Sequence, residues 1–361
     1  MKIAVLNLPF DNNYGGNLQR YALVKVLQRM GHQVEHIDLQ LRYSLPWFKK
    51  PLCYAKRIAK KMFLDKNTPI FFEEQLAVQA KERNMLALNF YEKYIPHTQA
   101  VYSIIDIKAI CAVEKFDAYV VGSDQVWRKE MTGRFGLENY FLKFTCKECV
   151  KRIAYAVSMG TDESYSKQLV KSLAPLYNCF DAVSVREYSA LRLLRSYGWV
   201  TPQPVWVLDP TMLLLPSDYQ RLVENAETVD DITSGKIFCY VLDMNSDVDK
   251  TIRKYEQSLG MSSVITGLAE TATVSIEQWL CYLLNCSFVI TDSYHGTVFS
   301  ILFNKPFVFV GNERRGNARI DSLFRMFDIK DVNEINWAEI NKRIEEQRNH
   351  SISFLQKSLQ L

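Results

Sequence analysis

Residues 291–297, TDSYHGT, combine side chains that bind an anion and move a proton. They follow a predicted strand at 288–290 and precede a predicted helix at 298–303. Backbone amides at a helix N-terminus attract negative charge, and a glycine lets a ligand approach the backbone. A histidine at this junction can donate or accept a proton. The candidate anion-binding residues of this segment are Ser293, Tyr294, His295 and Gly296.

Charged side chains also follow other predicted strands. Arg186 offers a guanidinium that binds carboxylate or phosphate through two parallel hydrogen bonds. Asp124 is a candidate base. The loop after the predicted strand 306–310 is rich in arginine, and Arg315 and Arg319 are its candidate anion ligands. The alternatives are a structural ion pair at Arg186, a helix cap at Asp124 and a solvated arginine turn.

A glycine-rich turn, NNYGGN at 12–17, follows the first predicted strand, 2–8. Its asparagine and tyrosine side chains can hydrogen-bond hydroxyl groups or phosphate oxygens. The turn has only one adjacent pair of glycines and no P-loop lysine, so it matches neither the dinucleotide motif nor a P-loop. An ordinary turn is the alternative. The candidate ligands of a hydroxyl-bearing substrate are Asn13, Tyr14, Gly15, Asn17 and Asp124.

The elements that must position these side chains alternate between strand and helix. A strand at 2–8, a helix at 18–30 and a strand at 34–38 form a βαβ unit, which predicts a parallel sheet. The 361 residues exceed the roughly 250–300 that one core comfortably serves. We therefore predict an α/β fold of two Rossmann-like domains, 1–213 and 214–361, that face a cleft. Ligands of such sheets bind beyond the carboxyl ends of the strands.

Composition excludes several classes of protein. The 44 Lys and Arg against 40 Asp and Glu give a net charge of +4, which is too mild to indicate nucleic-acid binding. Most of the 8 cysteines lie in apolar runs, as buried free thiols do. The pair Cys146 and Cys149 has no second pair to complete a zinc site, so we expect no metal. No signal peptide or spanning segment is apparent, and the expected location is cytoplasmic.

Residues 42–66 differ from the rest of the chain in charge, with eight Lys or Arg against Asp65 alone. A helix over 54–64 would group four basic residues on one side and apolar residues on the other. Such a helix, preceded by Trp47 and Phe48, suits peripheral contact with an anionic membrane. The alternative is a solvated helix that packs by its apolar stripe. The four basic residues are Lys56, Arg57, Lys60 and Lys61.

Six segments, in order, resemble the polysaccharide pyruvyl transferase family from about residue 12 to about residue 325. They are NYG at 13–15, FDAYVVGSDQVW at 116–127, IAYAVS at 153–158, VSVRE at 183–187, DPT at 209–211 and TDSYHG at 291–296. The resemblance implies a fold similar to that of GT-B glycosyltransferases. It also implies an enzyme that moves the pyruvyl group of phosphoenolpyruvate onto a sugar diol. The product would be a pyruvate ketal on a bacterial surface polysaccharide or its lipid-linked precursor, with phosphate released.

The resemblance assigns roles to particular residues. Arg186 and His295 fall on the donor-binding pattern, and together with Asp124 they are the expected catalytic residues. Many relatives carry an arginine two residues before the histidine, where this chain has Ser293. Arg315 or Arg319 is expected to supply that missing cation. Phosphoenolpyruvate acts as a co-substrate, and no cofactor is expected. The glycine-rich turn at 12–17 and Asp124 then face the sugar acceptor.

Two other functions fit parts of the pattern. A nucleotide-sugar glycosyltransferase on the same fold would also need arginines and helix amides to hold its diphosphate. A non-catalytic binding protein with a degenerate site is the other alternative, because Ser293 departs from the family pattern. If the acceptor sugar is carried on a polyprenyl diphosphate, the enzyme is expected at the inner face of the cytoplasmic membrane.

Overall fold

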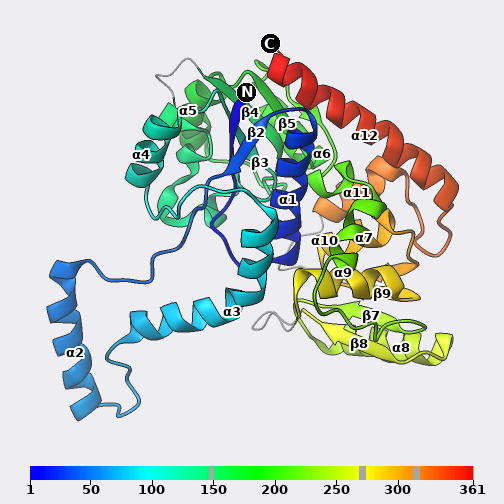
Figure 1. Cartoon of the computed structure of the whole chain (residues 1–361), viewed down its shortest axis with the longest axis horizontal. Coiled ribbons are helices and arrows are strands. Elements are labelled where there is room, and N and C mark those ends of the chain that lie inside the picture. The colour runs from blue at the N-terminus through cyan, green and yellow to red at the C-terminus, as the bar shows by residue number, and fades with distance from the viewer. Residues whose placement is uncertain (146–149, 268–273, 312–317, 361) are drawn as a thin grey trace.

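Two parallel β-sheets organise the chain in a computed structural model, which describes residues 1–145, 150–267, 274–311 and 318–360 (Figure 1). The six-stranded sheet has the order β2 (Gln33–His36), β1 (Lys2–Leu6), β3 (Ala118–Gly122), β4 (Lys151–Val157), β5 (Ala182–Val185), β6 (Val205–Trp206). The four-stranded sheet has the order β10 (Phe307–Phe309), β9 (Phe288–Thr291), β7 (Ile237–Tyr240), β8 (Ser263–Thr266). All pairings between these strands are parallel. The α/β fold of two Rossmann-like domains is therefore confirmed.

Helices connect and cover the strands. They are α1 (Tyr14–Arg29), α2 (Lys50–Phe63), α3 (Phe72–Tyr94), α4 (Ile104–Glu114), α5 (Lys167–Tyr177), α6 (Tyr188–Ser196), α7 (Pro216–Glu224), α8 (Ser246–Leu259), α9 (Ile276–Asn285), α10 (Tyr294–Leu302), α11 (Ala318–Phe327) and α12 (Trp337–Gln360). Among the described helices, none is long and apolar enough to cross a membrane.

Two predicted loops are in fact the first turns of helices. Helix α1 begins at Tyr14 and not at residue 18, because the Asn13 side chain caps it by accepting a hydrogen bond of 3.0 Å from the Gly16 amide. Helix α10 begins at Tyr294 and not at residue 298, because Ser293 caps it in the same way. The glycine-rich turn and the TDSYHGT segment therefore both form helix N-termini.

The last helix, α12, returns from the C-terminal half of the chain to the six-stranded sheet (Figure 1). The Ser351 hydroxyl accepts a hydrogen bond of 3.0 Å from the Leu208 amide, and the Arg348 Nε donates one of 2.9 Å to the Met212 carbonyl. Leu355 is fully buried in the core that this helix completes. The domain limits 1–213 and 214–361 stay a prediction, and the last helix of the second range packs on the first sheet.

The described cysteines are free thiols, and four of the six are buried. This agrees with the expectation of buried thiols in apolar runs. Cys146 and Cys149 lie outside the described residues.

Candidate active site between the two domains

The N-termini of α1 and α10 meet where the two domains face each other. A Cβ atom placed on Gly15 would lie 1.9 Å from Nδ1 of His295, so the imidazole packs directly against the α1 backbone. Because no side chain larger than hydrogen fits between the two helices, glycine is required at this position. Gly15 is a predicted ligand of the acceptor, and in the structure its missing side chain makes room for the His295 ring instead.

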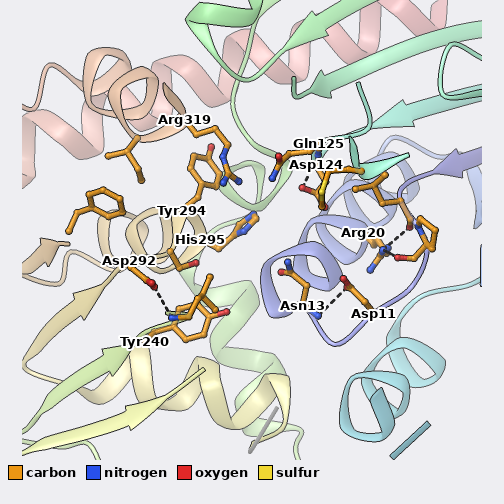
Figure 2. A pocket seen from close by; sticks show the side chains of 17 residues that line it. Asp11, Asn13, Arg20, Asp124, Gln125, Tyr240, Asp292, Tyr294, His295 and Arg319 are labelled. Atoms are coloured by element: carbon orange, nitrogen blue, oxygen red, sulfur yellow. Dashed lines mark hydrogen bonds between the residues drawn. The ribbon is translucent and has the colours of Figure 1, made fainter. Parts of the chain in front are cut away.

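A pocket opens beside this contact (Figure 2). His295, Tyr294 and Arg319 lie on the side of the C-terminal domain. Asp124 and Asn13 lie opposite, on loops of the N-terminal domain, beside residues that sequence reasoning did not single out. The predicted residues that line the pocket are Asn13, Asp124, Ser293, Tyr294, His295 and Arg319. The structure thus brings together side chains from four distant segments.

Arg186 lies behind the pocket wall and its side chain is completely buried. Its guanidinium is 2.9 Å from Asp209, 3.2 Å from Glu187 and 3.6 Å from Asp124, measured between nitrogen and oxygen atoms. It also lies 4.8 Å from the centre of the Tyr294 ring. Burial by itself would lower the pKa of the guanidinium, but the surrounding carboxylates outweigh burial and raise the pKa of Arg186. The structural ion pair considered for Arg186 is therefore present.

Asp209 connects Arg186 to the histidine. Its Oδ2 atom lies 3.7 Å from Nε2 of His295 and also accepts a hydrogen bond from the Gln19 amide group. Its Oδ1 atom accepts hydrogen bonds of 3.0 and 2.7 Å from the amide and hydroxyl of Thr211. Burial would raise the pKa of this carboxyl, yet His295, Arg186 and Thr211 together lower the pKa of Asp209 well below its usual range. An ionised carboxylate behind an imidazole can orient the ring.

Arg319 is the second guanidinium of the site. It lies 5.5 Å from the centre of the Tyr294 ring and lines the pocket. Burial, followed by the charge of Arg186, lowers the pKa of Arg319. Its guanidinium is a cation in the pocket wall to which an anionic group of a ligand can bind.

Asp124 adopts an unusual backbone conformation, with a φ of 67°. Residues other than glycine rarely occupy this left-handed region, although Asp does so more often than most. One carboxylate oxygen accepts a hydrogen bond of 2.8 Å from the Gln125 amide and lies 3.6 Å from Arg186. The side chain keeps 20% of its surface exposed and faces the pocket (Figure 2).

Other predicted site residues have structural contacts instead of lining the pocket. The Tyr14 hydroxyl donates a hydrogen bond of 2.9 Å to the Val274 carbonyl, and burial raises the pKa of Tyr14 to about 12. Asn17 is fully buried, and its amide group donates hydrogen bonds to the carbonyls of Asp11 and Asn13. Gly296 packs against the Thr291 side chain. Arg315 lies outside the described residues.

Several residues of the site were missed by sequence reasoning. Asp209 was quoted only as part of the DPT segment, and no local pattern shows that its carboxylate meets His295. Arg20 lines the pocket and donates hydrogen bonds to the carbonyls of Leu8 and Pro9, at 2.9 and 3.2 Å. Asp11 lies beside it in the lining of the pocket. The position of Arg20 within an apolar helix was the one available signal of a buried charge.

Comparison with known proteins decides the family. The chain matches the family described as polysaccharide pyruvyl transferase over residues 13–314. It belongs to that family. The protein is therefore a transferase, and the matched range includes every predicted site residue except Arg315 and Arg319. No curated protein matches the chain.

Solved structures confirm the architecture. A UDP-GlcNAc 2-epimerase from Methanocaldococcus jannaschii is 12% identical, with a TM-score of 0.50 over 97% of this chain and 93% of that chain. A UDP-GlcNAc 2-epimerase from Neisseria meningitidis, bound to UDP-GlcNAc, is 9% identical, with a TM-score of 0.52 over 99% of this chain and 100% of that chain. At such low identity these similarities show the fold alone, and they extend over both domains of this polysaccharide pyruvyl transferase family member.

Replacing Asp209 by Asn should destabilise the protein by about 3–5 kcal/mol, because it leaves the buried Arg186 charge with one carboxylate fewer. Because folding lowers the pKa of Asp209, the ionised carboxylate stabilises the folded protein at pH values above about 3.9, the ordinary pKa of an aspartate. That contribution is lost as the pH falls below about 4. Urea unfolding of the wild type and Asp209→Asn at pH 7, 5 and 3 measures the difference. A gap that stays constant down to pH 3 contradicts the assignment.

Two neighbouring glycines of α1 provide a matched pair of variants. Gly15→Ala forces a methyl group into the His295 ring and should cost about 1–3 kcal/mol by overpacking, together with a loss of transferase activity. Gly16→Ala places its methyl group 3.6 Å from the nearest atom, Cβ of Asn13, and should keep both stability and activity. Urea denaturation and an activity assay of the two variants test the contact. Equal stability and equal activity of the two variants would mean that the His295 ring does not pack against Gly15.

Proposed function

We propose that the protein transfers the pyruvyl group of phosphoenolpyruvate to two hydroxyls of one sugar, forming a ketal and releasing phosphate. One observation carries this proposal: a histidine at a helix N-terminus, backed by a buried carboxylate, faces a pocket with an arginine on one side and an aspartate on the other. Membership of the polysaccharide pyruvyl transferase family supports the same transfer.

The donor is an anion at both ends, with a carboxylate and a phosphate. The N-terminus of α10 and the guanidinium of Arg319 suit these groups. Ser293 stands where many relatives carry arginine, and its hydroxyl caps α10 by accepting from the Gly296 amide at 3.4 Å. Arg319 lines the same pocket and takes the place of the missing cation. In the proposal, Ser293, Tyr294, His295 and Arg319 bind the donor, and Gly296 supports them by packing against the Thr291 side chain.

The reaction adds one proton to carbon, removes one proton from each of two hydroxyls and breaks one C–O bond to phosphate. Protonation of the donor methylene turns it into a methyl group and leaves positive charge at C2. One sugar hydroxyl adds to C2 and loses its proton. The C–O bond to phosphate then breaks, and phosphate leaves with the electron pair. The second hydroxyl adds to the same carbon, loses its proton and closes the ring.

The residues divide these tasks. His295, oriented by Asp209, donates the proton to the methylene group or to the departing phosphate. Asp124, exposed on the opposite wall, accepts a proton from the sugar hydroxyl. Arg186 has no exposed side-chain surface, so in the proposal it stabilises Asp209, Asp124 and the Tyr294 ring from behind.

The acceptor side of the pocket is built by the N-terminal domain. Asn13 lines the pocket there with Asp11 and Arg20, and these polar groups suit a hydroxyl-rich sugar. Tyr14, Gly15 and Asn17 support this wall from within α1. The proposed acceptor is a sugar of a surface polysaccharide or its polyprenyl-diphosphate-linked precursor, modified in the cytoplasm. The proposed chemistry uses no cofactor.

Binding of phosphoenolpyruvate tests the donor site. Arg319→Gln should weaken binding about 10- to 100-fold, because a hydrogen bond to a charged group is lost. The matched control is Arg325→Gln on the same helix, whose guanidinium lies 3.7 Å from the centre of the Tyr188 ring and does not line the pocket. Isothermal titration calorimetry with phosphoenolpyruvate and with UDP-GlcNAc measures both ligands. Binding of UDP-GlcNAc alone would favour a nucleotide-sugar glycosyltransferase, and binding of neither would favour a non-catalytic protein.

Loss of the proton donor should separate binding from turnover. His295→Gln keeps a polar side chain at the pocket and should bind phosphoenolpyruvate within a few-fold of the wild type. Its turnover should fall about 10²- to 10⁴-fold, because general acid catalysis is removed. Phosphate release with a panel of glycosides that carry two free hydroxyls measures the rate. Near wild-type turnover in this variant would remove His295 from the mechanism.

A further inference from the structure

Helix α2 lies outside both domains (Figure 1). It projects from the body on the segment that follows β2 and is joined by a turn to the outer end of α3 (Figure 1). None of its residues is buried. Even the large apolar side chains of Leu52, Met62 and Phe63 expose 77%, 69% and 80% of their surfaces. The alternative of a solvated helix packed by its apolar stripe is therefore not what the structure shows.

The side chains of α2 divide into two faces. At about 3.6 residues per turn, Leu52, Ala59 and Phe63 follow one another along one side, and Ile58 and Met62 continue the same apolar arc. Lys56 and Lys60 border the arc on one side, whereas Lys61, one turn from Arg57, lies on the face turned away from the arc. All three lysines are exposed.

Contacts with the start of α3 set the orientation of the apolar arc. Arg57 forms two hydrogen bonds of 2.6 Å with the Glu73 carboxylate and one of 3.1 Å with the Ile70 carbonyl. The Tyr54 ring packs edge-on against Phe71 at 5.3 Å. Arg57 and Tyr54 lie opposite the apolar arc, so the arc faces away from the protein. Arg57, grouped at first with the free basic residues, is thus held by Glu73.

We propose that α2 docks the protein on the surface of an anionic lipid bilayer, with its apolar arc in the interface and its lysines at the headgroups. The charge of the segment around α2 favours a lipid surface over a second copy of the chain as its partner. Residues 42–66 carry eight basic residues against one acidic residue. Two such helices packed face to face would repel each other, whereas an anionic surface attracts the basic segment. The long lysine side chains can reach the headgroups while the apolar residues lie deeper.

This arrangement gives reversible attachment. A helix with one apolar and one basic face lies in the plane of the interface, where its binding combines apolar burial with attraction to anionic lipid. Trp47 and Phe48, both exposed just before α2, extend the apolar surface at its N-terminal end. The inference does not depend on the proposed pyruvyl transfer, because no residue of α2 lines the pocket.

Co-sedimentation of the full chain with vesicles tests the proposal. The probes are phosphatidylcholine vesicles with and without one third phosphatidylglycerol, at low and high salt. The wild type should bind only the anionic vesicles and dissociate at high salt. The variant Lys56→Gln/Lys60→Gln/Lys61→Gln should bind on the order of a hundredfold more weakly, at about fivefold per lysine. The variant Leu52→Ser/Met62→Ser/Phe63→Ser should also lose binding and, because α2 buries nothing, should melt like the wild type.

Matched variants on other helices control for charge and apolarity. Lys250→Gln/Arg253→Gln/Lys254→Gln removes the same charge from exposed positions of α8, and Ile105→Ser/Val113→Ser removes exposed apolar side chains from α4. Both variants should bind vesicles like the wild type. Equal binding by every variant, binding to neutral vesicles, or no binding by the wild type overturns the proposal. So does a dimer, seen by sedimentation velocity, that only the apolar α2 variant dissociates.

Discussion

The buried guanidinium of Arg186 is the interaction on which the site depends. A charged group that is shielded from solvent must be paired with an opposite charge. Arg186 is surrounded by carboxylates from three separate segments of the N-terminal domain. Two of those carboxylates also belong to the site, because Asp209 reaches His295 and Asp124 faces the pocket. The ring of Tyr294, on the C-terminal domain, covers the same guanidinium. One buried cation therefore positions His295, Asp124 and the contact between the domains.

The second constraint is the close approach of two helix N-termini. Parallel sheets direct the helices that follow their strands toward the carboxyl edge, so α1 and α10 both start at the cleft. Gly15 lets the imidazole of His295 lie directly on the α1 backbone. The histidine thus depends on both domains, since α10 carries it, Asp209 orients it and α1 supports its ring. A change in the angle between the domains would move His295 relative to Asp124, so fold and chemistry are coupled at this contact.

The catalytic body and the α2 arm obey different physical rules. The body is held by large cores in which strands and helices bury their apolar side chains. The arm buries none of its own residues, and its position rests on polar and aromatic contacts with the start of α3. An exposed apolar arc bordered by lysines adds little to folding stability. Exposed apolar surfaces of this kind are typical of interaction sites.

Local patterns in the sequence determined the alternation of strands and helices, the two-domain fold and the family. They also identified His295, Asp124, Asn13 and Arg319, because polar residues after predicted strands meet at the carboxyl edge of a parallel sheet. Only the tertiary structure decided which charges face a ligand and which are buried. The sequence left open whether Arg186 binds a ligand or forms a structural ion pair, and it gave Asp209 no role. Contacts between residues more than twenty positions apart enclose both. Burial and long-range pairing depend on packing between segments, and no local pattern of residues encodes them.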